Sequence, residues 1–148
     1  MLRRRDKERA FTLFEVMIIV ALISILALII VPRLLAASRR GREAALHENL
    51  QQLRQAIQRF EGDTGAFPPA LTDLIVATGA AISAPQDGAG ISVDQDGYRG
   101  PYLYTEDGSL PTDPFTNAAD WHYDNATGEL HSASRLTALN GESTYDTW

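Results

Sequence analysis

An apolar stretch of 21 residues, 11–31, lies near the start of the chain and constrains the fold more than any other feature. Only Thr12, Glu15 and Ser24 interrupt it with polar side chains. A helix of this length spans about 31 Å at 1.5 Å per residue, which matches the roughly 30 Å hydrocarbon core of a bilayer. The stretch therefore predicts one membrane-spanning helix, which follows a basic leader, residues 1–10, of net charge +3.

The helical pattern continues beyond Pro32 as an amphipathic stem. Five large apolar residues recur at spacings of four, three, four and three, as one face of a helix requires: Leu46, Leu50, Leu53, Ile57 and Phe60. Gly62 follows them and is expected to end the helix. Residues 32–61 therefore predict a stem that packs its stripe on a head formed by residues 62–148. Because proline removes a backbone hydrogen bond, we expect a kink or a locally meltable turn at Pro32.

Short strand patterns in the head predict a small antiparallel sheet. The segments Trp121–Asp124 and Glu129–Ala133 read as a hairpin around a four-residue turn, in a register that places Tyr123 opposite Leu130. A further short strand is expected at 102–104. Together with the long helix, these patterns predict an α+β fold, in which the second half of an N-terminal helix packs on the small antiparallel sheet of the head.

Charge is segregated along the chain. The formal net charge of −6 includes +3 over residues 33–61 and −11 over residues 62–148. An acidic balance of this kind argues against nucleic acid as a partner. The absence of cysteine excludes disulfides and thiolate sites, and His122 with His131 are too few for a structural zinc site. The sequence lacks a phosphate-binding loop, a nucleophile elbow and a zinc-protease motif, so we expect no enzymatic activity, no catalytic residue and no metal ligands.

Two residues near the start of the chain do not fit an ordinary secretory signal. Such a signal has its small-residue cleavage site after an apolar core of roughly 7–15 residues, whereas the small residue Ala10 precedes a longer core. Glu15 lies near the start of the expected membrane helix, and an acid at a helix centre costs on the order of 2.5–3.5 kcal/mol on insertion scales. An acid retained there needs a positive partner. A plain interfacial acid is the alternative.

The segment 9–17 resembles the class III signal of type IV prepilins and type II secretion pseudopilins. The matching residues are Phe11, Thr12, Leu13, Phe14 and Glu15, with Ala10 where glycine is usual. The resemblance implies that a prepilin peptidase cleaves between Ala10 and Phe11 and methylates the new amine of Phe11. It also implies that Glu15 pairs with the N-terminal amine of a neighbouring subunit and sets the axial register between subunits.

Pro32 adds to this resemblance. It is the 22nd residue counted from Phe11, where pilins commonly carry a proline that melts during assembly. Glu15 and Pro32 are therefore the expected assembly residues. The implied partners are other copies of the chain, minor pseudopilins, the prepilin peptidase and an inner-membrane assembly platform. The implied location is the bacterial inner membrane, crossed once, with a cytoplasmic N-terminus and a periplasmic head that joins the pseudopilus after processing.

Three segments, 63–68, 97–103 and 110–115, are similar to motifs of the G-type major pseudopilin of type II secretion systems. The implied function is a structural subunit of the pseudopilus that drives protein export across the outer membrane. The Gly-Pro-Asp-Gly segment and acidic calcium loop of the G-type are not visible in residues 134–148. We therefore expect no cofactor, with a structural calcium ion in the head as the open alternative.

Two other functions remain open at this point. One is a type IV pilin, major or minor, for adhesion, motility or DNA uptake. The other is a membrane-anchored binding protein that never polymerises, which would be cleaved after Ala37. N-terminal sequencing separates them, because a methylated Phe11 indicates assembly whereas a start at Ser38 indicates a released or anchored head.

Overall fold

The structure is a computed structural model that describes residues 12–105 and 107–148. It contains one long helix, α1 (Leu13–Thr64, 52 residues), and a two-stranded antiparallel sheet of β1 (His122–Tyr123) and β2 (Leu130–His131). Three short 3-10 helices complete it: η1 (Leu71–Leu74), η2 (Gly79–Ala81) and η3 (Tyr145–Thr147). The predicted α+β class is therefore confirmed. The chain divides into two compact units, up to Arg39 and from Arg40 onward.

The first unit is helical over all its described residues from Leu13 to Arg39. α1 contains a segment long and apolar enough to cross a membrane, with a mean hydropathy of 3.1 over its most apolar window. Pro32 lies inside α1, and the helical assignment continues on both sides of it. A turn that melts at Pro32 during assembly stays a prediction.

α1 ends at Thr64, three residues beyond the end expected from Gly62. The residue that ends it is Gly65, whose φ of 73° lies in the left-handed region that glycine adopts without strain. The Gly65 N–H donates to the carbonyl of Glu61 at 2.8 Å. The Thr64 hydroxyl donates to the carbonyl of Phe60 at 2.8 Å. These two bonds close the last turn of α1.

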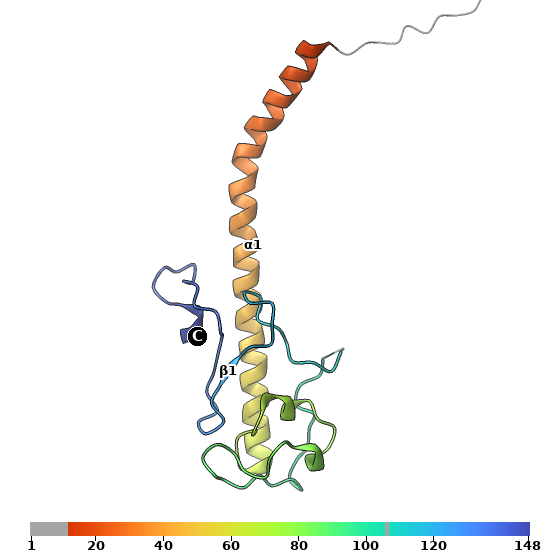
Figure 1. Cartoon of the computed structure of the whole chain (residues 1–148), viewed down its shortest axis with the longest axis vertical. Coiled ribbons are helices and arrows are strands. Elements are labelled where there is room, and N and C mark those ends of the chain that lie inside the picture. The colour runs from red at the N-terminus through yellow and green to blue at the C-terminus, as the bar shows by residue number, and fades with distance from the viewer. Residues whose placement is uncertain (1–11, 106) are drawn as a thin grey trace, which may run out of the picture. The chain divides into compact units, whose positions relative to one another are not determined.

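The second unit is built around the apolar stripe of α1. All five stripe residues are buried, together with Ala56, and they pack on buried residues of the head: Leu74, Val93, Leu103, Trp121, Leu130, Ala138 and Tyr145. Figure 1 shows the head segments, green to blue, gathered around the yellow end of α1. The predicted packing of the stem stripe on the head is therefore confirmed.

The hairpin forms in the predicted register. Tyr123 pairs with Leu130, and His122 pairs with His131. The turn between the strands ends at Gly128, whose φ is 73° and whose N–H donates to the Asp124 carbonyl at 2.8 Å. A Cβ added at Gly128 would overlap the ring of Phe67. Glycine is therefore needed there both for the backbone conformation and for the packing.

The strand expected at 102–104 does not form, and this prediction is wrong. The N–H groups of Tyr102 and Leu103 both donate to the carbonyl of Leu74, at 2.9 and 3.1 Å. The Leu74 carbonyl in η1 therefore accepts both N–H groups, so these groups do not pair with a neighbouring strand. The apolar pattern of this segment reflects the burial of Leu103 in the core rather than strand pairing.

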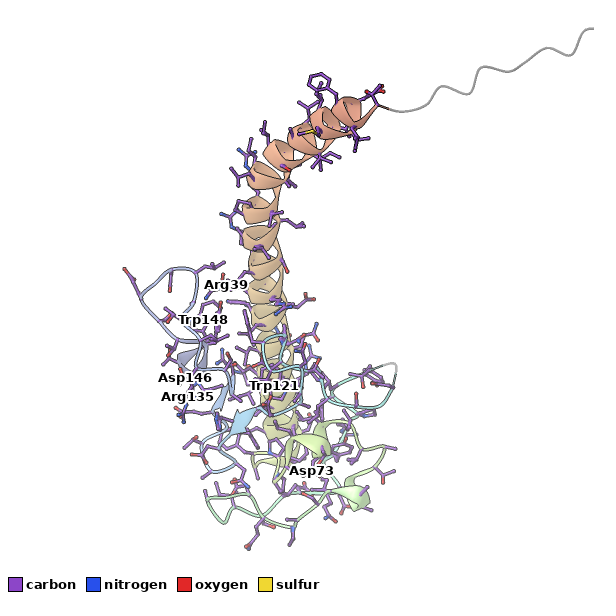
Figure 2. All side chains as sticks on the ribbon, turned by 45° about the horizontal axis from the view of Figure 1, so that its top comes forward. Arg39, Asp73, Trp121, Arg135, Asp146 and Trp148 are labelled. Carbon is purple, nitrogen blue, oxygen red and sulfur yellow. The ribbon has the colours of Figure 1, made fainter. Side chains whose placement is uncertain are left out.

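Asp73, labelled in Figure 2, organises the loop between η1 and η2. Its carboxylate is 1 % exposed and accepts hydrogen bonds from the N–H of Ala70 at 2.9 Å and from the N–H and hydroxyl of Ser83 at 2.9 and 2.7 Å. A buried carboxylate with three donors is well satisfied. The hydrogen bonds to the Asp73 carboxylate therefore hold this loop in place instead of helix or strand pairing.

Candidate assembly site

The expected assembly site begins at the first turn of α1. The Thr12 hydroxyl accepts the N–H of Glu15 at 3.2 Å, and the Thr12 carbonyl accepts the N–H groups of Glu15 and Val16 at 3.1 and 3.3 Å. Thr12 therefore caps the helix, which satisfies a donor that would otherwise lack a partner. The cap places the Glu15 carboxylate in the first turn, near the positive end of the helix dipole.

The side chains that follow form an apolar surface without cover in the described chain. Large apolar residues from Leu13 to Leu35 are all exposed, and Leu13 itself is 86 % exposed. In water such a surface would be unfavourable by about 25 cal/mol for each Å². It therefore requires lipid or other apolar helices around it. Glu15 is also exposed, so its carboxylate is accessible to a cation on another molecule.

The structure brings only some of the predicted site residues together. Thr12 and Glu15 meet in the first turn, and Leu13 is the first residue of α1. Pro32 lies 17 residues beyond Glu15, or about 26 Å along a helix, so the two lie at separate places and their roles in assembly stay predictions. Ala10 and Phe11 lie outside the described residues. Cleavage between them, and methylation of Phe11, therefore stay predictions.

Two of the G-type-like segments meet at the end of α1. The Tyr102 hydroxyl donates to the Asp63 carboxylate at 2.8 Å and accepts the N–H of Arg99 at 2.9 Å. The rings of Tyr98 and Tyr102 pack edge to face on each other and on Phe60, with centroids 5.2–5.9 Å apart. The resemblance in these segments therefore reflects one aromatic cluster that closes the head over the last turns of α1.

This cluster shifts the acidity of its phenols. Burial raises the pKa of Tyr102 to about 12; the hydrogen bond from Arg99 opposes the rise, and the neighbouring Asp63 carboxylate adds to it. Burial, and then the charge of Asp73, raise the pKa of Tyr98. The Tyr98 hydroxyl donates to the carbonyl of Val76 at 2.7 Å. Both phenols therefore stay protonated donors over the whole physiological range.

The third G-type-like segment is held by a buried acid. Asp113 is 0 % exposed, and its carboxylate accepts the N–H of Phe115 at 2.8 Å and a short hydrogen bond from the Ser132 hydroxyl. The Phe115 ring stacks on Tyr145, with centroids 4.2 Å apart. Asp113 thus ties its own turn to the segment of Ser132, and the neighbouring Phe115 packs this turn on Tyr145. Its role is structural, which its place in a motif did not reveal.

Arg54 links the last residues of the chain to α1. Its guanidinium donates to the Leu130 carbonyl at 2.7 Å and, by a short bond, to the main-chain oxygen of Trp148. The Trp148 ring lies edge to face against His47, at 6.3 Å between centroids. Figure 2 labels Trp148 in this terminal segment. Arginine at this position therefore acts as a clamp between helix and head.

Sequence reasoning missed these three contacts for a common reason. Asp63, Asp113 and Arg54 are polar residues whose partners lie far along the chain, up to 94 residues away for Arg54. Membership of a motif was the only signal for Asp63 and Asp113, and Arg54 had none. Among the described residues, no group of three or more His, Asp or Glu side chains lies close enough to hold a metal ion. A calcium ion in the head is untested.

The comparisons with known proteins agree with the helix and its first turn. A model of the prokaryotic N-terminal methylation motif matches residues 5–31. The chain is similar to type II secretion system core protein G of Klebsiella michiganensis, with 28 % identity over 111 residues that cover 71 % of this chain and 78 % of that protein. It is similar to the protein of the same name in Pseudomonas aeruginosa, with 24 % identity over 124 residues that cover 79 % and 87 %. No solved structure matches the chain significantly.

The uncovered apolar helix, its first-turn acid and the methylation motif define a class of protein. The match to the methylation motif supports the resemblance of the segment 9–17 to the signal of type IV pilin-like proteins. Within this class it is like core protein G of type II secretion systems, which confirms the G-type branch expected from the head segments. The apolar helix and these relatives together favour a protein anchored in a membrane.

Proposed function

We propose that the chain is a structural subunit of the type II secretion pseudopilus. The observation that carries this proposal is the apolar surface of α1, which the described chain leaves uncovered around an accessible carboxylate in its first turn. A helix of this kind is incomplete alone and becomes favourable when copies of it pack together. The similarity to core protein G over most of both chains supports the secretion system rather than another filament.

In this proposal the protein acts mechanically and not as an enzyme. A prepilin peptidase cleaves after Ala10 and methylates Phe11, and the new amine of one copy pairs with Glu15 of a neighbour. Pairing offsets the unfavourable burial of both charges in a medium of low dielectric constant. The partners are other copies, minor pseudopilins and an assembly platform of the inner membrane. The head lies in the periplasm, and the growing filament moves secreted proteins towards the outer membrane.

Deletion of the gene tests this function against that of a surface pilus. We expect the deletion strain to retain its secreted proteins in the periplasm and to keep any surface pili it makes. The full chain supplied in trans should restore secretion. Loss of surface pili with normal secretion would instead identify a type IV pilin. N-terminal sequencing of the mature protein should show a methylated Phe11, and a start at Ser38 would exclude assembly.

A further inference from the structure

A stretch of α1 just beyond the apolar surface is basic and uncovered. Arg40 and Arg42 are both exposed, and in the described chain the side chain of neither forms an ion pair or a hydrogen bond. Gly41 lies between them, and a Cβ added there would have no atom within 4 Å, so the helix surface is open at this point. Beyond residue 10 the chain uses arginine for every cation. Arginine is the cation suited to planar, two-point pairing with carboxylates.

A second surface of the same chain is complementary to this stretch. An open hollow of about 550 Å³ is lined by Pro85, Ser92, Val93, Asp94, Gln95 and Asp96. The carboxylates of Asp94 and Asp96 are exposed, and neither makes an ion pair within the described residues. The Asp94 carboxylate accepts the N–H of Asp96 at 3.1 Å, which holds the two acids side by side. The hollow offers carboxylates for a guanidinium and an apolar edge for its stem.

The two surfaces of one molecule cannot meet each other. The N–H of Asp94 donates to the carbonyl of Thr64 at 3.0 Å, so the hollow lies at the end of α1. Arg40 precedes Thr64 by 24 residues of continuous helix, which is about 36 Å. This separation is far beyond the reach of an arginine side chain. The hollow is therefore accessible only to an arginine of another molecule.

We propose that the acidic hollow at Asp94 and Asp96 receives one arginine of this basic stretch, Arg40 or Arg42, from a second copy of this chain, because residues two apart on a helix point to different faces and only one of them can enter the hollow. The inference rests on the proposed function and names the head-to-stem contact of the filament. Between parallel copies such a contact joins two different surfaces, so it can repeat from copy to copy and extend into an open helical polymer. If the copies are parallel, the contact offsets them by about 36 Å along the helix.

Anionic lipid headgroups are the competing partner of the arginines. Arg40 lies five residues beyond Leu35, the last large exposed apolar residue of the apolar surface, or about 8 Å of helix. The headgroup layer on one side of a bilayer is only roughly 5–8 Å thick. The arginines therefore lie near the outer edge of this layer, within reach of both lipid headgroups and a neighbouring head. The pair of adjacent carboxylates in an open hollow favours the neighbouring head as the partner.

Charge reversal with rescue tests the contact in a strain that carries the secretion machinery. The full-length variants R40E/R42E and D94R/D96R should each reduce the filament recovered by sedimentation at least about tenfold, because like charges then face each other. The combined fourfold variant should restore filament, since the pairs are remade with opposite polarity. The matched controls R59E and E129R change exposed charges elsewhere and should assemble normally.

The outcomes separate this inference from the proposed function. Failure of the wild-type chain to form filament would overturn the function itself. Wild-type assembly with normal assembly of both charge-reversed variants would overturn the inference alone. Loss of filament in R40E/R42E without rescue in the fourfold variant would also overturn it and assign the arginines to lipid.

Cross-linking gives a second readout that does not depend on reversed charges. Because the chain has no cysteine, R42C/D96C carries only the two introduced thiols. A short bismaleimide should convert its filament into a ladder of multimers, whereas R42C or D96C alone and the control R59C/E129C should give none. A ladder in the control, or none in R42C/D96C within filaments that still assemble, would contradict the contact.

Discussion

At the scale of single residues, buried carboxylates take the place of regular structure in this head. Asp73 and Asp113 are nearly or wholly inaccessible, and each accepts hydrogen bonds from more than one segment. A two-stranded sheet of two residues per strand supplies few backbone ladder bonds. Side-chain acceptors therefore fix the loops that cover the stripe of α1.

Asp113 should be among the most sensitive positions of the head. Replacing Asp113 by Ala leaves the buried Ser132 hydroxyl and the partly buried Phe115 N–H without an acceptor, and an unsatisfied buried donor costs about 1–3 kcal/mol. We expect D113A to lower the free energy of unfolding by about 2 kcal/mol or more. Urea unfolding of the full chain in detergent, followed by tryptophan fluorescence, measures it, because both tryptophans, Trp121 and Trp148, are in the head.

The exposed Asp120 provides the control for this measurement. Among the residues that the structure describes, its carboxylate accepts only the Thr116 hydroxyl at 2.6 Å, so D120A should change the free energy of unfolding by about 0.5 kcal/mol or less. Equal effects of D113A and D120A on the free energy of unfolding would show that the burial of Asp113 does not contribute to the stability of the head.

The buried phenols predict a loss of stability in alkali. Burial raises the pKa of Tyr98, Tyr102 and Tyr123 above the ordinary value of about 10, to about 12 for Tyr102. The folded head therefore keeps protons that the unfolded chain releases. The resulting stability is complete below about pH 10 and is lost as the pH rises towards the folded values. Urea midpoints of the full chain at about pH 9, 10 and 11 should fall progressively above pH 10.

A variant shows whether the phenols cause this loss. Replacing Tyr102 by Phe removes one of the three groups, so the urea midpoint of Y102F should depend less steeply on pH than that of the wild type. An unchanged slope would exclude Tyr102 as a contributor.

At the scale of elements, α1 holds the head through its apolar stripe. Leu53 is 0 % exposed within this stripe, and truncating a buried leucine to alanine typically costs about 2–5 kcal/mol. We expect L53A to lower the free energy of unfolding by that amount in the same tryptophan assay. Gln55 is exposed on the same helix, and Q55A should be close to neutral. A neutral L53A would contradict the packing of the stem on the head.

The elements also show what the sequence permits one to predict. The spacing of Leu46 to Phe60 predicted the buried face of α1, because a helix converts that spacing into one side. Alternation around a short turn predicted the hairpin register. The prediction of a strand at 102–104 was wrong, because a buried leucine between two tyrosines is compatible both with a strand and with a loop that is hydrogen-bonded to the rest of the head. The clamp by Arg54 and the buried Asp113 were unpredictable, since their partners lie far along the chain.

At the scale of the whole molecule, the chain presents surfaces that are unfavourable or unpaired in isolation. The apolar residues from Leu13 to Leu35 are exposed, Glu15 lies in the first turn among them, and charge is segregated between stem and head. Each feature becomes favourable when copies pack together. These surfaces favour assembly into a filament, and Glu15 is the residue at which this assembly can be tested most directly.

Replacement of Glu15 by Leu in the full chain, expressed with the secretion machinery, provides that measurement. We expect E15L to insert in the membrane and to be processed to Phe11, because leucine suits an apolar helix. Sedimentable filament and secretion should both be lost, since the amine of a neighbour then lacks its carboxylate. The control S24A removes another polar group of the same stretch, whose hydroxyl donates to the Val20 carbonyl at 2.7 Å, and should assemble normally. Normal filaments from E15L would contradict the account.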